Sequence, residues 1–367
     1  MSKKRTPYRF IFAGGGTGGH LYPALAVAQK IRELKPEAEI LFVGTKDKIE
    51  ARVVPEHDFD FKAIWISGFA RKFNTNNILF PVKILVSLLQ SLIINFGFKP
   101  RVAIGSGAYV SGPVVWMASL IGSKVMLLEQ NSYPGVTNRL LEKKATEIHI
   151  TFEESKKYFR EQDKLKVTGN PIRINLKLID KVEAMSTFGL HVSKKALLVI
   201  GGSGGAKSLN HAVANNLEKL KEIGIQVLWQ TGKVYYNEFR RYNDDDVKVM
   251  EYISDMSAAY SACDLVLARA GATTIAEVSL LGLPVIFVPS ANVAADHQYK
   301  NAKAILDASA AELIADKNVE SELFVKVSQL MFNKERQNSL RKNIVEFAKP
   351  NAAFDIATRA IQLAETL

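Results

Sequence analysis

A glycine-rich run, Gly14-Gly15-Gly16-Thr17-Gly18-Gly19-His20, separates the apolar stretch Tyr8 to Phe12 from the helix-like stretch Pro23 to Leu34. Glycine lets the backbone turn sharply and lets amide groups approach a ligand, and the first amides of a helix are donors at its positive end. The run therefore predicts a strand, an anion-binding turn and a helix. Its G-x-G-x-x-G spacing alone is weak evidence for a ligand, because any sharp strand-to-helix turn favours glycine.

Composition narrows the class of protein. The 367 residues are 47% hydrophobic and 23% charged, which suits a globular chain of two domains. A single cysteine, Cys263, excludes an internal disulfide framework, and no long apolar segment precedes the glycines, so we expect a cytoplasmic location. The net charge of +11 favours nucleic acid, an acidic membrane surface or a phosphorylated substrate. We expect no nucleic-acid partner, because an arginine-rich tail and a basic-aromatic repeat are both missing.

Short apolar runs alternate with longer amphipathic runs along the first 150 residues. Phe10 to Ala13 and Ile40 to Val43 read as strands on either side of the helix Pro23 to Leu34, and this order predicts a parallel sheet. The second strand ends in Phe42-Val43-Gly44-Thr45, without the acidic residue that holds the ribose hydroxyls in nicotinamide-binding folds. The sequence therefore argues against a dehydrogenase.

The most apolar stretch of the chain is Ile78 to Phe98. Pro81, Lys83, Gln90 and Asn95 interrupt it, whereas a spanning helix needs about 20 predominantly apolar residues. It is either a core helix or a helix lying on a membrane surface. The second alternative gains support from nearby cations that suit anionic lipid, namely Arg71, Lys72, Lys83 and Lys99.

Two further glycine turns follow. Gly105-Ser106-Gly107-Ala108-Tyr109-Val110-Ser111-Gly112-Pro113 connects a strand at Val102 to Ile104 with a helix at Val114 to Ile121. The strand Ala196 to Ile200 leads into Gly201-Gly202-Ser203-Gly204-Gly205-Ala206-Lys207-Ser208, which departs from a P-loop because alanine replaces the last glycine. Between them, Glu129-Gln130-Asn131 follows the strand Lys124 to Leu128, either as ligand contacts at the sheet edge or as ordinary loop residues.

Proline and glycine punctuation places a domain boundary near Gly169-Asn170-Pro171. In the second half, strands are expected at Gln226 to Gln230, Val247 to Met250, Leu265 to Ala268 and Pro284 to Pro289. The triplet Asp244-Asp245-Asp246 could bind a metal, but its position after Arg240 and Arg241 favours a solvated loop.

These motifs together resemble the MurG family of bacterial transferases, which add N-acetylglucosamine to the lipid-linked peptidoglycan precursor. The resemblance covers nearly the whole chain and is carried by motifs in the family's order: Gly-Gly-Gly-Thr-Gly-Gly-His, Gly-Ala-Tyr-Val-Ser-Gly-Pro, Glu-Gln-Asn, Gly-Asn-Pro-Ile-Arg, Gly-Gly-Ser-Gly-Gly-Ala, Gly-Ala-Thr-Thr-Ile-Ala-Glu and a late Asp-His-Gln. It implies an α/β fold of GT-B architecture, with two doubly wound Rossmann-like domains facing a cleft. Residues 1–170, joined by a C-terminal helix at 351–367, would face acceptor and membrane, and residues 171–350 would bind the UDP-sugar.

The resemblance also implies roles for individual residues. Glu277 would accept both ribose hydroxyls, Ser203 would hold the diphosphate, Ile253 would offer its backbone to the uracil edge, and His20 would be the general base. The alternative for Glu277 is a charge that complements the helix dipole, and for His20 a helix cap. The other donor-binding residues would be Thr17, Gly18, Gly19, Asn131, Arg173, Ala272, Thr273, Thr274, Ile275, Ala276 and Gln298.

The implied reaction inverts the donor's anomeric carbon, attacked by the C4 hydroxyl of the muramyl sugar of the undecaprenyl-diphosphate-linked precursor. The resemblance implies no metal and no cofactor, and a peripheral location on the cytoplasmic face of the cell membrane. The sequence departs from the family pattern at Gly204, usually glutamine, and at Ala108, usually glycine. A UDP-N-acetylglucosamine epimerase of the same architecture is the alternative function, and a noncatalytic membrane adaptor would not need three glycine loops.

Overall fold

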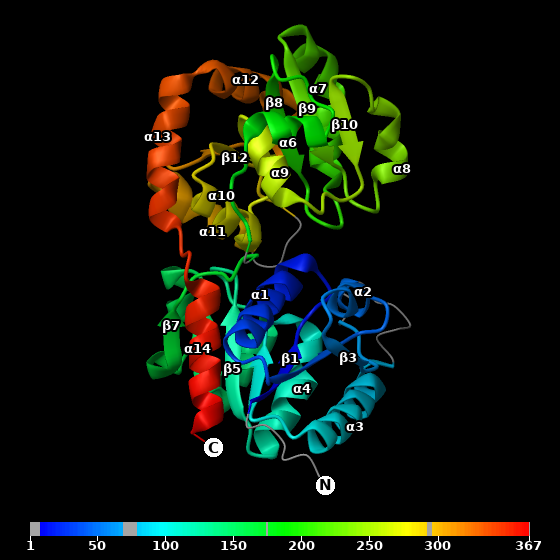
Figure 1. The fold of residues 1–367 in the computed structure, drawn as a ribbon, viewed down its shortest axis with the longest axis vertical. Coiled ribbons are helices and arrows are strands. Elements are labelled where there is room, and N and C mark those ends of the chain that lie inside the picture. Colours follow the sequence, from blue (N-terminus) through cyan, green and yellow to red (C-terminus); the bar gives the residue numbers. More distant parts are fainter. Residues whose placement is uncertain (1–7, 69–78, 174, 292–295, 367) are drawn as a thin grey trace. The chain divides into compact units, whose positions relative to one another are not determined.

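The computed structural model describes residues 8–68, 79–173, 175–291 and 296–366. It divides into two compact units (Figure 1). Unit 1 comprises Met1–Ile174 with Lys349–Leu367, and unit 2 comprises Asn175–Ala348. These limits fall within a few residues of the expected domain limits, and the assignment of acceptor and donor to the two domains stays a prediction.

Unit 1 is built on a parallel sheet in the order β3-β2-β1-β4-β5-β6-β7. The strands are β1 (Arg9–Ala13), β2 (Glu39–Gly44), β3 (Asp60–Ala63), β4 (Val102–Gly105), β5 (Lys124–Glu129), β6 (Glu147–Ile150) and β7 (Leu165–Val167). The helices are α1 (Gly18–Leu34), α2 (Ile49–Glu56), α3 (Phe80–Phe98), α4 (Ala108–Leu120), α5 (Val136–Leu141) and α14 (Ala352–Glu365). The strands β1, β2, β4 and β5 are buried, which is why they read as continuous apolar runs in the sequence, whereas the edge strands β3 and β7 are largely exposed.

Unit 2 repeats this plan with the parallel order β10-β9-β8-β11-β12-β13. Its strands are β8 (Lys195–Ile200), β9 (Ile225–Gln230), β10 (Val247–Met250), β11 (Leu265–Ala268), β12 (Val285–Phe287) and β13 (Glu312–Leu313). Its helices are α6 (Lys181–Thr187), α7 (Lys207–Glu222), α8 (Tyr236–Phe239), α9 (Met256–Ala262), α10 (Ala272–Leu281), α11 (His297–Asp307), α12 (Val319–Phe332) and α13 (Lys334–Ile344). The expected α/β fold with two doubly wound sheets is confirmed.

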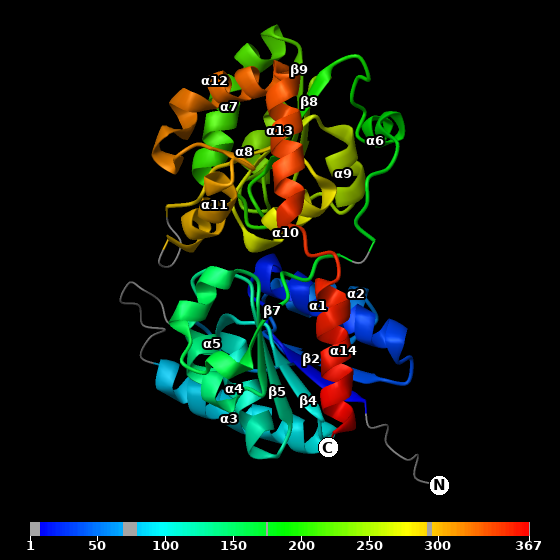
Figure 2. The ribbon, with the colours of Figure 1, turned by 90° about the vertical axis from the view of Figure 1, so that its left-hand side faces the viewer.

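The last helix, α14, belongs to unit 1 although it follows unit 2 in the sequence. Figures 1 and 2 both place it beside α1. Its residues Ile356, Ala360 and Ala364 are fully buried in the core that contains β1 and α1. At the surface of this contact, Arg359 of α14 forms an ion pair with Glu147 of β6, and Glu147 also contacts His149.

Two predicted helix starts were wrong. The helix expected from Pro23 begins at Gly18, and the helix expected from Val114 begins at Ala108, so that each glycine turn forms the first turn of its helix. Proline is tolerated early in α1 because its missing amide costs one hydrogen bond, to the carbonyl of exposed Gly19.

Candidate functional site

Both sheets reverse their strand order at one point, between β1 and β4 in unit 1 and between β8 and β11 in unit 2. Open parallel sheets bind ligands at such points, at the carboxyl ends of the strands. The first and second glycine turns follow β1 and β4, and the third follows β8. The sequence therefore places its most unusual turns at the two positions where this fold forms a site.

Four of the predicted donor-binding residues of unit 1 lie beyond the carboxyl ends of β1 and β5. Thr17 is the exposed N-cap of α1, Gly18 and Gly19 form its first turn, and Asn131 follows β5 with its amide donating to Glu129. Arg173 follows β7 and stacks its guanidinium 4.9 Å from the ring centre of Tyr22. It belongs to unit 1, whereas the predicted boundary assigned it to the second domain.

The His20 side chain is held at the reversal point of unit 1. Its Nδ1 atom lies 2.9 Å from the carbonyl oxygen of Ser106 and 2.9 Å from Oε1 of Gln130. The amide nitrogen of Gln130 donates to the carbonyl of Leu128, so the Gln130 oxygen faces the imidazole. Because both neighbours accept hydrogen bonds, Nδ1 carries the proton, and Nε2 of the neutral ring carries the lone pair. The alternative cap role fails, since the N-cap of α1 is Thr17.

The second glycine turn packs directly against this imidazole. A β-carbon on Gly107, whose φ is 92°, would lie 2.8 Å from Nδ1 of His20, so only glycine fits there. The next residue, Ala108, has a φ of 62°. This left-handed conformation costs a non-glycine residue about 1 to 2 kcal/mol. Ala108, where the family pattern has glycine, therefore adopts a left-handed conformation that strains the backbone locally.

The triplet Glu129-Gln130-Asn131 forms the loop that lies beside His20. The buried Glu129 carboxylate accepts hydrogen bonds from the amides of Asn131 and Gly135 and from the Asn138 side chain. Burial raises the pKa of Glu129 although these hydrogen bonds act in the opposite direction. Glu129 thus stabilises the loop after β5, and Gln130 orients His20.

The anion expected at the first glycine turn is supplied by the chain itself. The amide of Gly16 donates to Oε2 of Glu50, at 2.8 Å, and Glu50 is 1% exposed. At the Gly16 amide the anion is therefore a carboxylate from α2, whereas the binding roles expected for Thr17, Gly18 and Gly19 stay predictions.

The third glycine turn, which carries half-buried Ser203, packs against a second loop. A β-carbon on Gly205 would lie 2.2 Å from the carbonyl oxygen of Thr231, and one on Gly232 would lie 2.2 Å from the Gly205 amide. Both glycines have positive φ, 80° and 82°. Gly204, in contrast, has open space around its β-carbon position, so a glutamine would fit there.

A pocket of about 620 Å³ opens beside this turn, a size common for small-molecule sites. Arg269 is its most buried charged group. Its Nη1 atom contacts Asp316 at 2.7 Å and its Nη2 atom donates to the Ser208 hydroxyl at 2.7 Å. The pocket is lined by Gly201, Gly205, Ala206, Lys207, Ser208, His211, Tyr235, Arg269, Ser290, Gln298 and Asp316.

Glu277 lies in the second turn of α10 and is 4% exposed. Its Oε2 atom accepts a hydrogen bond of 2.8 Å from the hydroxyl of Tyr260 in α9. Because Glu277 is outside the first turn, the alternative role of complementing the helix dipole is not supported. Of the neighbouring predicted residues, three are half-buried, Thr273, Thr274 and Ala276, and two are buried, Ala272 and Ile275.

Two predicted contacts are already engaged within unit 2. The amide of Ile253 donates to Oε1 of Gln230 at 2.9 Å, which occupies the donor expected to meet the uracil edge. The Oε1 atom of Gln298 accepts from the amide of Ser290 at 2.8 Å. A ligand at either residue would use the carbonyl of Ile253 or the side-chain nitrogen of Gln298.

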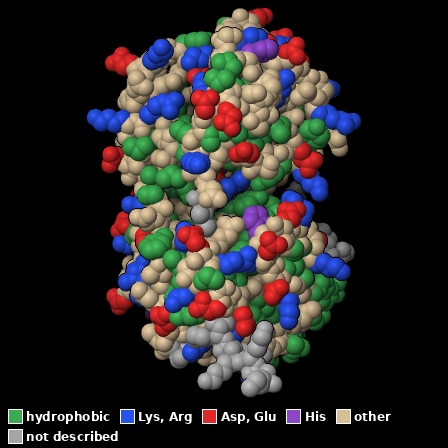
Figure 3. All heavy atoms as spheres, in the orientation of Figure 1, with side chains coloured by type: hydrophobic (Ala, Val, Ile, Leu, Met, Phe, Trp, Pro, Cys, Tyr) green, Lys and Arg blue, Asp and Glu red, His purple; other side chains and the backbone are tan. Residues whose placement is uncertain are grey.

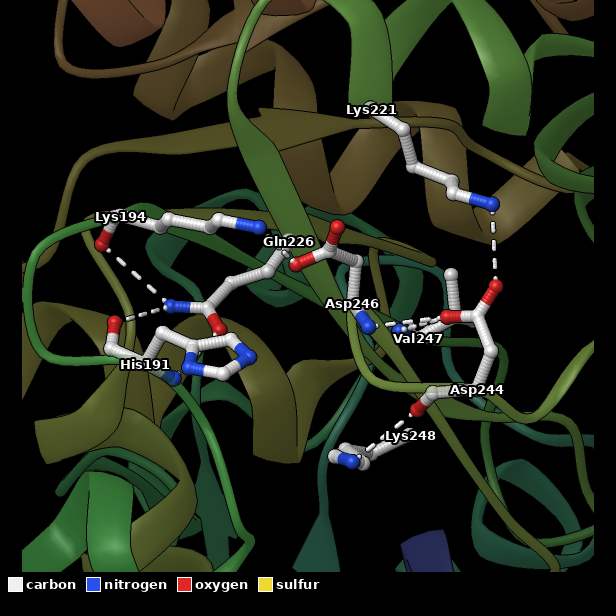
Figure 4. A network of polar contacts seen from close by, with 8 residues as sticks. All are labelled: His191, Lys194, Lys221, Gln226, Asp244, Asp246, Val247 and Lys248. Carbon is white, nitrogen blue, oxygen red and sulfur yellow. Dashed lines mark hydrogen bonds and ion pairs between the residues drawn. The ribbon is translucent and has the colours of Figure 1, made fainter.

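The aspartate triplet Asp244 to Asp246 forms a surface network (Figure 4). Asp244 contacts Lys221 at 3.0 Å and accepts hydrogen bonds from amides two and three residues later, and Asp246 contacts Lys194 at 2.5 Å. The triplet precedes β10, so it lies at the end of that strand opposite the site. Among the residues that the structure describes, no cluster of His, Cys, Asp or Glu could hold a metal ion.

Sequence reasoning assigned no individual role to several residues that the structure brings to these sites: Glu50, Gln130, Lys207, Ser208, Tyr260, Arg269 and Asp316. Arg269 carried a usable signal, because a charged residue directly after an apolar strand lies at the sheet edge. Glu50 carried none, since its partners lie in two other loops.

Two doubly wound units of this topology define a protein of the GT-B fold class. The N-terminal and C-terminal domain models of glycosyltransferase family 28 match residues 10–150 and 196–356. The chain belongs to this family, and within it to the MurG transferases.

The chain is similar over its whole length to relatives with one shared description, UDP-N-acetylglucosamine--N-acetylmuramyl-(pentapeptide) pyrophosphoryl-undecaprenol N-acetylglucosamine transferase. That of Cytophaga hutchinsonii is 43% identical and covers 99% of both chains, and that of Flavobacterium psychrophilum is 42% identical and covers 98% of both. The crystal structure of Acinetobacter baumannii MurG is 26% identical, with a TM-score of 0.73, and the match covers 97% of this chain and 100% of that one.

Proposed function

We propose that this enzyme transfers N-acetylglucosamine from UDP-N-acetylglucosamine to the C4 hydroxyl of the muramyl sugar of an undecaprenyl-diphosphate-linked peptidoglycan precursor. The observation that carries the proposal is the full-length similarity to relatives that are described by this activity. The same motifs that support the family also supply a base, a carboxylate and an anion-binding turn at the strand reversals of the two sheets.

Unit 2 offers the groups that a nucleotide diphosphate needs. Glu277 is a buried carboxylate suited to accept ribose hydroxyls, with Tyr260 fixing one of its oxygens. The 16-residue helix α7 begins at Lys207 in the third glycine turn, so its first amides and the exposed lysine would bind an anion together. These groups would stabilise the charge that accumulates on UDP as it leaves, so no metal is needed for that step.

His20 supplies the base in this proposal. Its Nδ1 proton is held by Ser106 and Gln130, and its Nε2 lone pair can accept the proton of the attacking hydroxyl. As the C4 oxygen forms its bond to the anomeric carbon, the bond to the UDP oxygen breaks and the configuration inverts. The proton then resides on the imidazole.

The exposed face of α3 suits a lipid-linked substrate. Its buried residues are polar, Ser87, Ser91 and Asn95, whereas Leu85, Leu89, Ile93 and Phe96 are 58–72% exposed. Helices of soluble proteins normally bury the apolar stripe. In the part of the chain that the structure describes, α3 alone is long and apolar enough to cross a membrane, with 22% of its central window buried.

Neighbouring helices extend this apolar surface, which we name the α3–α5 face. It consists of Leu85, Leu89, Ile93 and Phe96 of α3, Trp116 and Leu120 of α4, and Val136 and Leu140 of α5. Figure 3 shows hydrophobic side chains gathered where Figure 1 places α3. Lysines border it, with Lys144 5.4 Å from the Trp116 ring and Lys83 5.7 Å from the Trp65 ring.

This combination of an apolar face and bordering cations supports docking on an anionic membrane surface, from the cytoplasmic side. A spanning α3 would have to give up the hydrogen bond that Asn95 donates to the Val114 carbonyl of α4. We therefore propose a peripheral enzyme. Of the cations that the sequence suggested for this role, Arg71 and Lys72 lie outside the described residues, as does Ile78.

The decisive experiment measures UDP release with and without a polyprenyl-diphosphate-linked muramyl acceptor, and the mass of the acceptor product. Release that requires the acceptor, with one N-acetylhexosamine added to it, is the expected result. Conversion of the donor to a soluble epimer without acceptor would instead support the epimerase alternative.

A further inference from the structure

The carboxylate of Glu50 is buried against the first glycine turn. It belongs to the first turn of α2, is 1% exposed and accepts three hydrogen bonds. Its Oε2 atom accepts from the amide of Gly16 at 2.8 Å, and its Oε1 atom accepts from the amide and the hydroxyl of Thr45, at 2.9 and 2.8 Å. One side chain thus joins the loops that follow β1 and β2.

Two glycines leave room for this carboxylate. A β-carbon on Gly15 would lie 2.3 Å from the carboxyl carbon of Glu50, and one on Gly44 would lie 2.3 Å from its Cγ atom. Such distances are far below van der Waals contact. Part of the glycine content of the first turn therefore serves an internal side chain rather than a ligand.

A hydrogen-bond partner of Glu50 also lies next to the second glycine turn. Thr45, which donates its hydroxyl to Glu50, lies close to Tyr109. Tyr109 follows Ala108 in the turn that packs on His20 through Gly107. The first turn also packs directly on the second, because a β-carbon on Gly14 would lie 1.8 Å from the hydroxyl oxygen of Ser106. The buried carboxylate thus joins the loops after β1 and β2, and the loop after β4 packs against them.

Glu50 also sets the charge at this turn. Within the described part of the chain, its partners are amides and a hydroxyl, and no cation pairs with it. Its negative charge faces the positive end of α1, where a substrate phosphate would otherwise bind. The first turn is thereby closed to a diphosphate at the Gly16 amide, whereas the turn of unit 2 keeps Lys207 at the head of α7.

We propose that Glu50 is a positioning residue for transfer: it acts as an internal anion that holds the Gly16 turn, and through it the base His20, in the reactive arrangement. Glu50 does not touch the substrate and exchanges no proton. Its removal should therefore lower kcat by a larger factor than it raises the donor Kd. The inference rests on the proposed function, because it is measured through transferase turnover.

The test compares Glu50→Ala with Glu142→Ala. Glu142 is a matched control, since it is also a buried carboxylate of unit 1 that accepts a backbone amide, that of Arg160, but it does not contact either glycine turn. We expect Glu50→Ala to lower kcat about 10- to 100-fold, as small displacements of reacting groups do, and to raise the donor Kd by a smaller factor. Glu142→Ala should keep kcat within threefold.

Formate provides the readout that a merely structural role would not give. Added to Glu50→Ala, this small carboxylate can enter the vacated space and accept from Gly16 and Thr45, so kcat should recover severalfold. Formate should not raise the kcat of Glu142→Ala. An unchanged kcat in Glu50→Ala, an equal loss in both variants, or no recovery with formate overturns the proposal.

Glu50→Gln keeps the test decisive if Glu50→Ala does not fold. Only one oxygen remains in the glutamine, so its NH2 group must face either the Gly16 amide or the donors of Thr45, and kcat should fall at least about fivefold. A wild-type kcat in Glu50→Gln would overturn the proposal. Failure of the proposed function is recognised separately, because then neither the unmodified enzyme nor Glu142→Ala would transfer sugar.

Discussion

The Nδ1 atom of His20 lies 2.9 Å from the side-chain oxygen of Gln130, which is 110 residues away in the sequence. This contact and the Ser106 carbonyl decide that Nε2 holds the lone pair of the neutral ring. The residue after β5 therefore determines which nitrogen of a residue after β1 can act as a base. The position of Gln130 in the Glu129-Gln130-Asn131 triplet did not indicate that it orients His20.

His20→Ala should lower turnover about 100-fold or more, because general-base contributions are roughly 10² to 10⁴. Donor affinity should stay nearly intact, since the lost group acts on the acceptor hydroxyl. Steady-state kinetics and calorimetry with UDP-N-acetylglucosamine check this. His57→Ala is the matched control, because Nδ1 of His57 also contacts a carbonyl, that of Val53. Turnover of His20→Ala within a factor of a few would refute the base assignment.

Glu277→Ala should weaken donor binding by about 1.5 to 3 kcal/mol, the range for hydrogen bonds to a charged acceptor. Titration calorimetry with UDP-N-acetylglucosamine measures this loss. The companion Tyr260→Phe removes the hydroxyl that orients the carboxylate but keeps its charge, so its effect should be smaller. Unchanged donor affinity in folded Glu277→Ala would mean that Glu277 serves the packing of α9 and α10 only.

The α3–α5 face should bind vesicles by two separable forces. Lys83→Glu with Lys144→Glu should reduce sedimentation with anionic vesicles at low salt, because each cation near such a surface contributes about 1 kcal/mol. Leu89→Asp with Ile93→Asp should reduce binding at high salt as well, since apolar contacts are not screened. Donor binding should not change in either variant.

Val325→Asp on α12 of unit 2 is the control for the apolar variant, because Val325 is also exposed, at 49%. It should leave vesicle binding as it is. Equal sedimentation of the unmodified enzyme with neutral and anionic vesicles would contradict the electrostatic part of the proposal. Equal loss with Val325→Asp would contradict the assignment of the face.

The ion pair between Glu147 and Arg359 should make stability depend on pH. Burial alone would raise the pKa of Glu147, but hydrogen bonds from His149 and Arg359 outweigh it and lower the pKa from 4.5 to about 2. The stabilisation is therefore fully present above pH 4.5 and is lost as the pH falls from there towards 2.

Arg359→Ala should accordingly lower the melting temperature at pH 7, and the difference from the unmodified protein should shrink as the pH falls from 5 to 3. Lys303→Ala, which breaks the exposed pair with Asp307 in α11, is the control and should have little effect at any pH. A difference that stays constant across this pH range would exclude Glu147 as its source.

Ala108→Gly should raise the melting temperature. Relief of the left-handed conformation recovers about 1 to 2 kcal/mol, and the added freedom of glycine in the unfolded chain costs about 0.5 to 1 kcal/mol. The net gain is small and positive. Ala118→Gly in the same helix should destabilise, because Ala118 has no positive φ and lies in the core. Destabilisation by Ala108→Gly would show that the alanine methyl makes contacts worth more than the strain.

Nine strands of the described residues could be predicted because each is a short apolar run. The other four, β3, β6, β7 and β13, were not predicted, because they are very short or carry polar residues. Phe10 to Ala13, Lys124 to Leu128 and Leu265 to Ala268 became β1, β5 and β11 within one residue. The helix end at Gly282 was also predictable, since Gly282 has a φ of 61° and closes α10. Local patterns of this kind depend on a few adjacent residues only.

What the sequence could not provide are partners from distant segments. Glu50 is separated from Gly16 by 34 residues, and its burial depends on the gaps that Gly15 and Gly44 leave. The inward face of α3 could not be predicted from hydrophobicity either, because Ser87, Ser91 and Asn95 face unit 1 and the leucines do not. In α3 the apolar residues therefore do not mark the side that packs on the core.

The position of α14 has a consequence for synthesis on the ribosome. Unit 2 is an insertion between the first part of unit 1 and the helix that completes its core. At about 5 to 20 residues per second, the 174 residues of unit 2 take roughly 10 to 35 s to translate. For that interval the nascent first segment exposes the apolar side of α1 that Ile356 and Ala360 will cover. A chaperone that binds nascent chains would meet its target in the first segment made, and release from it would await the last helix.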